Sequence, residues 1–211
     1  MQLKIYVPKH PLIEHLANLI QSADIPLMLI KNSAIELTYW LCYEAMRNWI
    51  SLHDLDLRSL DGSSVTRLVN PNESLLAIPF VKSGLLMSES VNKLSPNIHF
   101  FYVSFKYRKS SCDVSDEDKL LLDDVNNYSK YLILDSIVLS ADRILALLSV
   151  LAAKGVDLSE IRIAFLICTS DVLQDIGRIY PSLTIYTSCV KNIRGESELA
   201  PYRKLLEYLQ T

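Results

Sequence analysis

Short runs of apolar residues alternate along the chain with segments in which apolar positions repeat every three or four residues. The continuous runs are typical of strands that are buried on both faces of a sheet. The spaced positions are typical of helices that bury one face. The predicted strands are LLAIPF (75–80), HFFYVSF (99–105), KYLILDSIV (130–138), RIAFLIC (162–168) and LTIYTSCV (183–190).

Helices are predicted before, between and after these strands. Pro11 suits the first turn of one helix, Pro26 interrupts the pattern before the next, and Gly155 ends the helix after the third strand. This alternation predicts an α/β fold with a parallel sheet covered on both faces. The predicted helices are 11–22, 33–50, 83–94, 142–154, 171–178 and an amphipathic C-terminal helix over 201–209.

Two polar segments interrupt the alternation. Residues 51–74 contain the turn signal Asp61-Gly62 between two strand-like stretches, which predicts a small hairpin arm. Residues 106–130 carry the charge cluster DEDK (116–119) and are expected to form a flexible loop over one edge of the sheet. The whole chain, 1–211, is expected to form a single domain.

Composition excludes some classes of partner. The net charge is −3 and no Lys/Arg cluster occurs, which argues against nucleic acid. The most apolar window, 144–153, is too short to span a bilayer, so no membrane partner is expected. Histidines are scattered, and the cysteines form no C-x-x-C pair, which favours a reducing compartment. These cysteines are Cys42, Cys112, Cys168 and Cys189.

Candidate chemistry lies where two predicted strands end. In open parallel sheets, ligands bind beyond the carboxyl ends of the strands. The two relevant segments are 80–84, which reads FVKSG, and 135–143, which reads DSIVLSADR. The second one joins a strand to a helix as phosphate loops do, but it contains no glycine.

Several stretches together resemble the uracil phosphoribosyltransferase family, in the same order and spacing, from about residue 8 to residue 193. The resemblance implies a type I phosphoribosyltransferase-like parallel sheet flanked by helices, and a homodimer. It also implies pyrimidine salvage, in which uracil and phosphoribosyl pyrophosphate give UMP and pyrophosphate with Mg²⁺. The matching stretches are KHPLIEHL (9–16), LCYEAMRNW (41–49), IPFVKSGLLM (78–87), YLILDSIVLSADRILALLSVLAAKGV (131–156) and IYPSLTIYTSCV (179–190).

The resemblance assigns phosphoribosyl pyrophosphate to a set of residues at the two strand ends and on the strand before the flexible loop. Asp135 occupies the acidic position and would be the Mg²⁺ ligand. No residues can be assigned to uracil, because the glycine-rich C-terminal segment of the family is reduced to Gly195. The assigned residues are Lys82, Arg108, Asp135, Ser136, Ser140, Ala141, Asp142 and Arg143.

These positions depart from the family's pattern, D-P-M-L-A-T-G-G-S. Ser140 replaces the threonine, Ala141 and Asp142 replace the two glycines, and Arg143 replaces the serine. Ala141 adds a Cβ where positive φ is expected. A carboxylate at Asp142 would repel a bound phosphate by about 4 kcal/mol at an effective dielectric near 20, which Arg143 would partly offset. The structural alternative is that Asp142 caps the following helix.

The first strand end is altered as well. Lys82 replaces an arginine of the family and loses its bidentate fork, and Leu86 replaces a glycine and would crowd the loop. Lys82 and Arg108 are equally compatible with being solvated surface cations.

Three functions therefore remain open. The first and favoured one is a family homologue with lost or weak catalysis and a binding, regulatory or structural role. The second is an active uracil phosphoribosyltransferase with an unusual loop. The third is a scaffold that docks through its C-terminal helix, which a cleft filled by Leu86, Leu139 or Arg143 would favour. The ligand would be phosphoribosyl pyrophosphate or a nucleotide, and the compartment the cytoplasm or a plastid stroma.

Overall fold

The computed structural model describes residues 2–57, 60, 62, 65–70, 72–95, 97–108 and 111–210, and of Arg108 the backbone alone. Within these residues, the central element is a six-stranded sheet with the order β1-β10-β9-β8-β4-β5, in which all neighbours pair parallel. The predicted parallel α/β architecture is confirmed. The strands are β1 (Lys4–Tyr6), β4 (Leu75–Pro79), β5 (Ile98–Phe100), β8 (Lys130–Val138), β9 (Ile161–Thr169) and β10 (Thr184–Lys191).

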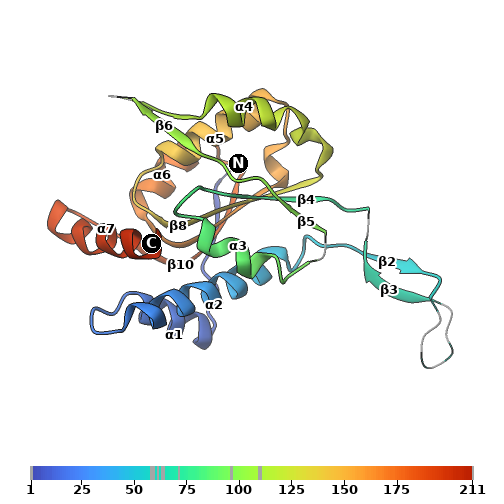
Figure 1. Ribbon diagram of the computed structural model, residues 1–211, viewed down its shortest axis with the longest axis horizontal. Helices are drawn as coiled ribbons and strands as arrows, with labels where there is room; N and C mark the ends of the chain where they lie inside the picture. Colours follow the sequence, from blue (N-terminus) through green and yellow to red (C-terminus); the bar gives the residue numbers. More distant parts are fainter. Residues whose placement is uncertain are drawn as a thin grey trace.

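Helices cover both faces of this sheet (Figure 1). The apolar run of β8 divides between the two layers, because Ile133 belongs to one core cluster and Leu132 and Leu134 to the other. That division explains why the strand reads as a continuous apolar run in the sequence. On one face lie α1 (Pro11–Ile20), α2 (Leu27–Met46), α3 (Leu85–Val91) and α7 (Glu196–Gln210); on the other lie α4 (Asp116–Leu121), α5 (Asp142–Ala153) and α6 (Ser170–Ile179).

Two helices begin well before the residues expected from the sequence. Helix α2 begins at Leu27 instead of residue 33, because Pro26 is its N-cap and does not break it. Helix α7 begins at Glu196 instead of residue 201, so that Pro201 lies inside the helix, where it lacks the N–H that would bond the carbonyl four residues earlier. No helix in the described part of the chain is both long and apolar enough to cross a membrane.

The predicted hairpin arm is confirmed. Strands β2 (Leu52–Leu55) and β3 (Thr66–Val69) pair antiparallel and project from the body of the molecule (Figure 1). Asp61 of the predicted turn lies outside the described residues. The base of the arm is tied down by Glu73, which pairs with Lys130 and accepts a hydrogen bond from the Ser51 backbone N–H at 2.9 Å.

The segment 106–130, expected to be a loop, contains regular elements. Strands β6 (Phe105–Arg108) and β7 (Ser111–Val114) form a second antiparallel hairpin, followed by α4 and a 3₁₀ helix, η1 (Leu122–Asn127). The predicted strand 99–105 is therefore wrong in its extent, since β5 ends at Phe100 and Phe105 belongs to this hairpin. The mobility of the segment stays a prediction. A further 3₁₀ helix, η2 (Leu158–Glu160), precedes β9.

Gly84 allows the loop after β4 to pass close to β8. A Cβ placed on Gly84 would lie 2.6 Å from the backbone N of Phe80 and even closer to the carbonyl oxygen of Leu134. These two atoms are themselves hydrogen-bonded at 3.1 Å across the strand ends, so neither can move aside freely. The contact fixes the position of the loop that faces the cleft described below.

We expect Gly84→Ala to lower the free energy of unfolding by about 1–3 kcal/mol, since overpacking against backbone atoms forces a shift of the strand ends. Urea denaturation measures this change. Gly195→Ala is the matched control, because nothing lies within 4 Å of a Cβ built at Gly195. Equal stability of the two variants would contradict the close approach.

Candidate functional site

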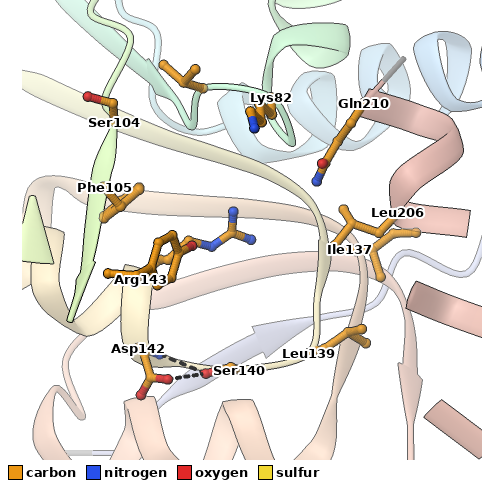
Figure 2. A pocket seen from close by; sticks show the side chains of 12 residues that line it. Lys82, Ser104, Phe105, Ile137, Leu139, Ser140, Asp142, Arg143, Leu206 and Gln210 are labelled. Atoms are coloured by element: carbon orange, nitrogen blue, oxygen red, sulfur yellow. Dashed lines mark hydrogen bonds between the residues drawn. The ribbon is translucent and has the colours of Figure 1, made fainter. Parts of the chain in front are cut away.

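A cleft of about 590 Å³ lies beyond the carboxyl ends of β4 and β8 (Figure 2). This is the predicted location, and both predicted strand-end segments contribute to it. The hairpin β6–β7 and helix α7 complete its walls. The lining residues are Val81, Lys82, Ser104, Phe105, Tyr107, Ile137, Leu139, Ser140, Asp142, Arg143, Leu206 and Gln210.

The loop after β4 holds Lys82 in a left-handed conformation, with φ of +76°. Among the described residues, Lys82 is the one non-glycine residue with positive φ, a conformation that costs about 1–3 kcal/mol and that surrounding contacts must enforce. Those contacts include the hydrogen bonds from Val81 N to Val103 O (2.9 Å) and from Gly84 N to Phe80 O (2.8 Å). The strained backbone places Lys82 at the wall of the cleft (Figure 2).

Arg143 and Asp135 form a buried ion pair at the floor of the cleft. The Asp135 side chain has no exposed surface, and its Oδ2 accepts a hydrogen bond from Arg143 Nη2 at 2.8 Å. Arg143 Nη1 donates to Ser83 Oγ at 3.0 Å, and its guanidinium lies 5.4 Å from the centroid of the Phe80 ring. The guanidinium therefore occupies the region beside the predicted phosphate loop (Figure 2).

Burial raises the pKa of the Asp135 carboxyl above its ordinary value, and the charge of Arg143 opposes this rise. Asp135 Oδ1 and Ser136 Oγ are buried and have no hydrogen-bond partner among the described residues. Arg143 thus provides the one cation that compensates a carboxylate removed from water. An ionised Asp135 therefore requires Arg143 at this position.

The predicted phosphate loop has a different geometry from the one expected. Ala141 is the N-cap of α5 with φ of −79°, so its Cβ causes no strain, and the expected positive φ is wrong. Asp142 does not cap α5, which has no side-chain cap hydrogen bond. Instead, Ser140 Oγ donates to Asp142 Oδ2 at 2.7 Å, which occupies the hydroxyl that was predicted to bind phosphate (Figure 2).

The charges around the cleft cancel. Lys82 and Arg143 are balanced by Asp142 and by Asp135 beneath them. A polyanion with several phosphate groups needs an excess of cations or a ring of backbone N–H donors. The described residues of this cleft provide no such excess.

Asp135 does not fit the predicted role of Mg²⁺ ligand. Mg²⁺ needs accessible oxygen ligands in octahedral geometry. Asp135 is fully buried, and its Oδ2 is bound by Arg143. No group of three or more His, Cys, Asp or Glu residues that could hold a metal occurs in the described part of the chain.

Helix α7 stands where the resemblance implies a glycine-rich, base-binding segment. Its residues Leu206 and Gln210 face the cleft, and Gln210 directs its side-chain amide into it (Figure 2). Leu86, expected to crowd the loop, packs instead into the core between the sheet and α2. The cleft remains open, and Leu139 and Arg143 contribute to its lining without filling it.

The structure brings four of the eight predicted site residues into the lining of one cleft. Lys82, Ser140, Asp142 and Arg143 line the cleft, whereas Ser136 is buried beneath it and the Arg108 side chain lies outside the described residues. The lining residues that lie outside both predicted strand-end segments are Ser104, Phe105, Tyr107, Leu206 and Gln210.

Phe80 and Ser83, which contact the Arg143 guanidinium, lie inside the predicted strand-end segment 80–84 and were therefore within reach of prediction. Leu206 and Gln210 were not, because the terminal helix carries no signal for a contact with β8 and α3.

Comparison with known proteins identifies the family. The family model described as uracil phosphoribosyltransferase matches residues 7–198. A relative from Porphyra purpurea, named uracil phosphoribosyltransferase homolog, is 30% identical over 94% of this chain and 93% of its own length. The uracil phosphoribosyltransferase of Synechococcus elongatus is 28% identical over 90% of this chain and 87% of its own length. The chain belongs to the uracil phosphoribosyltransferase family.

Solved structures support the same fold. The AQ2163 protein from Aquifex aeolicus has a TM-score of 0.72 and 19% identity, and the match covers 91% of this chain and 89% of that one. An adenine phosphoribosyltransferase from Trypanosoma brucei has a TM-score of 0.55 and 10% identity, with coverage of 92% and 87%. At these identities the similarity shows the phosphoribosyltransferase fold.

We expect Arg143→Met to lower the free energy of unfolding by about 3–5 kcal/mol, because it leaves a buried carboxylate unpaired. The loss depends on pH. Below the pKa of Asp135 in the unfolded chain, near 3.8, this carboxyl is protonated in both the folded and the unfolded state, so the substitution leaves no buried charge unpaired. As the pH rises from there toward the raised folded pKa, the cost grows. Urea denaturation across this range measures it.

Combining Asp135→Asn with Arg143→Met should recover most of the lost stability, since no buried charge then remains. The control is Arg178→Met, which removes an exposed pair with Asp175 worth about 0–1 kcal/mol. A loss for Arg143→Met that matches this control, or that is independent of pH, would contradict the role assigned to the buried pair.

Proposed function

We propose that this chain is a uracil phosphoribosyltransferase homologue that has lost phosphoribosyl transfer and acts as a binding or structural protein. The observation that carries the proposal is the Arg143–Asp135 ion pair at the floor of the cleft. The pair engages Asp135, the residue at the acidic position of the family's motif, at the strand end where the family's phosphate loop begins. The homodimer and the loss of Mg²⁺ binding are part of the same proposal.

Electrostatics supports the loss of transfer. Phosphoribosyl transfer depends on holding a polyanion in place and on stabilising the departing pyrophosphate. Asp142 places a carboxylate at the start of α5, where the helix N-terminus would otherwise favour an anion. Its Oδ2 accepts from Ser140, so the carboxylate and the hydroxyl satisfy each other and offer little to phosphate.

The cleft itself is retained, which supports a binding role over a purely structural one. Lys82 remains at the wall in a strained conformation, and strain of this kind clusters at ligand sites. Apolar side chains from β8, the β6–β7 hairpin and α7 form much of the rest of the lining. A ligand with an apolar or aromatic body and few charges fits these walls better than phosphoribosyl pyrophosphate does.

The compartment also belongs to the proposal. A relative from Arabidopsis thaliana, 22% identical over 88% of this chain, is named as chloroplastic. That name favours the plastid stroma over the cytoplasm as the location of this protein.

We expect the purified protein to form no detectable UMP from radiolabelled uracil, phosphoribosyl pyrophosphate and Mg²⁺. Calorimetric titration with phosphoribosyl pyrophosphate and Mg²⁺ should show no binding either, because the cleft lacks excess positive charge. The enzyme from Synechococcus elongatus, assayed in parallel, controls for the reagents. Formation of UMP by this protein would overturn the proposal in favour of an active salvage enzyme.

Removal of the opposing carboxylate should partly restore anion binding. We expect Asp142→Asn to raise the affinity for inorganic pyrophosphate about tenfold, which corresponds to about 1.4 kcal/mol after screening. Asp171→Asn is the matched control, since Asp171 lies in the first turn of α6, away from the cleft. Equal effects of the two variants on pyrophosphate titration would argue against repulsion by Asp142.

A further inference from the structure

A second cavity, of about 570 Å³, lies between α7 and the connection from α1 to α2. Figure 1 shows these two elements at the same end of the molecule, where α7 is red and α1 and α2 are blue. The cavity is separate from the strand-end cleft, because the two share no lining residue. Its size is typical of sites for small molecules, which measure about 300–1,000 Å³.

Helix α7 is the wall between the two cavities. Leu206 and Gln210 face the strand-end cleft, whereas Leu205 and Tyr208 face the second cavity. These positions lie on different sides of one helix. Most of α7 lies beyond residue 198, where the match to the family model ends. The second cavity is therefore built in part by a segment outside the region that the family model matches.

The lining of the second cavity is mainly apolar. Isoleucine and leucine side chains from α1 and α2 face Pro201, Tyr202 and Leu205 of α7. Lys204 is the one charged residue among the described residues that line it. Small-molecule sites commonly combine an apolar lining with a few polar groups that orient the ligand.

Lys204 is available to bind an anionic group. Its side chain is exposed, and its Nζ lies 5.6 Å from the centroid of the Tyr208 ring. No ion pair of Lys204 occurs within the described part of the chain, whereas the adjacent Arg203 pairs with Glu196. Contact with the ring favours a fixed position for the ammonium group at the edge of the apolar cavity.

We propose that this cavity binds a small amphipathic acid, with its apolar body among the isoleucine and leucine side chains and its carboxylate at Lys204. The charge of Lys204 selects an anionic headgroup, and the apolar lining selects the body. The proposal goes beyond the function proposed for the strand-end cleft and is independent of whether that cleft is catalytic.

An occupant of this cavity would also hold α7 in place. In the described part of α7, Leu205 and Leu209 are the buried residues, and Tyr202 and Leu206 pack against the same core while partly exposed, so few fully buried side chains attach the helix to the body. A ligand beside Leu205 adds contacts on the face that points away from the strand-end cleft. Bound acid therefore stabilises the helix that supplies Leu206 and Gln210 to the cleft.

The test uses octanoate and 1-octanol as probes in calorimetric titrations of the full chain. We expect octanoate to bind the unmodified protein and to slow amide hydrogen exchange in α7. Lys204→Glu should weaken octanoate binding by about fivefold or more, because it removes one exposed ion pair and adds a like charge, and it should leave 1-octanol binding unchanged. Arg203→Glu is the matched control, since it changes the net charge equally on the same helix but does not line the cavity.

A cavity-filling variant tests the location independently. Ala23 lines the cavity and is exposed, so Ala23→Trp should leave the fold intact, which a thermal melt checks, and abolish binding of both probes. Absence of octanoate binding to the unmodified protein would overturn the proposal. Equal weakening by Lys204→Glu and Arg203→Glu, or unchanged binding to Ala23→Trp, would also overturn it. If the unmodified protein is a dimer and Ala23→Trp is a monomer, the occupant of the cavity is a second copy of the chain, and the proposal is overturned as well.

Discussion

A carboxylate without exposed surface stays ionised only next to a cation, and at Asp135 that cation is Arg143. The pair joins three separate parts of the fold. Asp135 lies on β8, Arg143 in the first turn of α5, and Ser83, which accepts a hydrogen bond from Arg143, in the loop after β4. The ring of Phe80 lies against the same guanidinium. Because these contacts fix both strand ends at once, the geometry of the cleft depends on them.

This dependence sets the cost of binding a polyanion. A phosphate group that draws Arg143 toward itself leaves the buried Asp135 carboxylate without its cation. Asp135 Oδ1 already has no hydrogen-bond partner among the described residues. Any gain from the new contact is therefore offset by the loss of the old one. A ligand with few charges avoids this exchange, because it can occupy the cleft beside an intact ion pair.

The sequence predicted the layers of the fold well and the contacts within the site poorly. Continuous apolar runs such as 130–138 identify parallel strands because burial on both faces removes polar residues from either side. Local signals also placed Gly155, whose φ of +84° ends α5. The Arg143–Asp135 ion pair could not be predicted from the sequence. A side chain in the first turn of a helix can point either to solvent or to the preceding strand, and the residue pattern is the same in both cases. The resemblance to a glycine loop predicted a positive φ at Ala141, whereas the residue with a positive φ is Lys82.

The survival of a cleft does not require the survival of catalysis. Parallel strands joined by helices leave their carboxyl ends open at one edge of the sheet, so β4 and β8 produce a cavity whatever side chains line it. The chemistry comes from the few residues at the strand ends and from the segment that closes the edge. Here an arginine in the first turn of α5 neutralises the acidic residue of β8, and a helix replaces the glycine-rich segment that the family resemblance implies. Since a helix satisfies its own backbone groups, α7 can offer side chains such as Gln210 to a ligand but not the row of free N–H and C=O groups that reads the edge of a base.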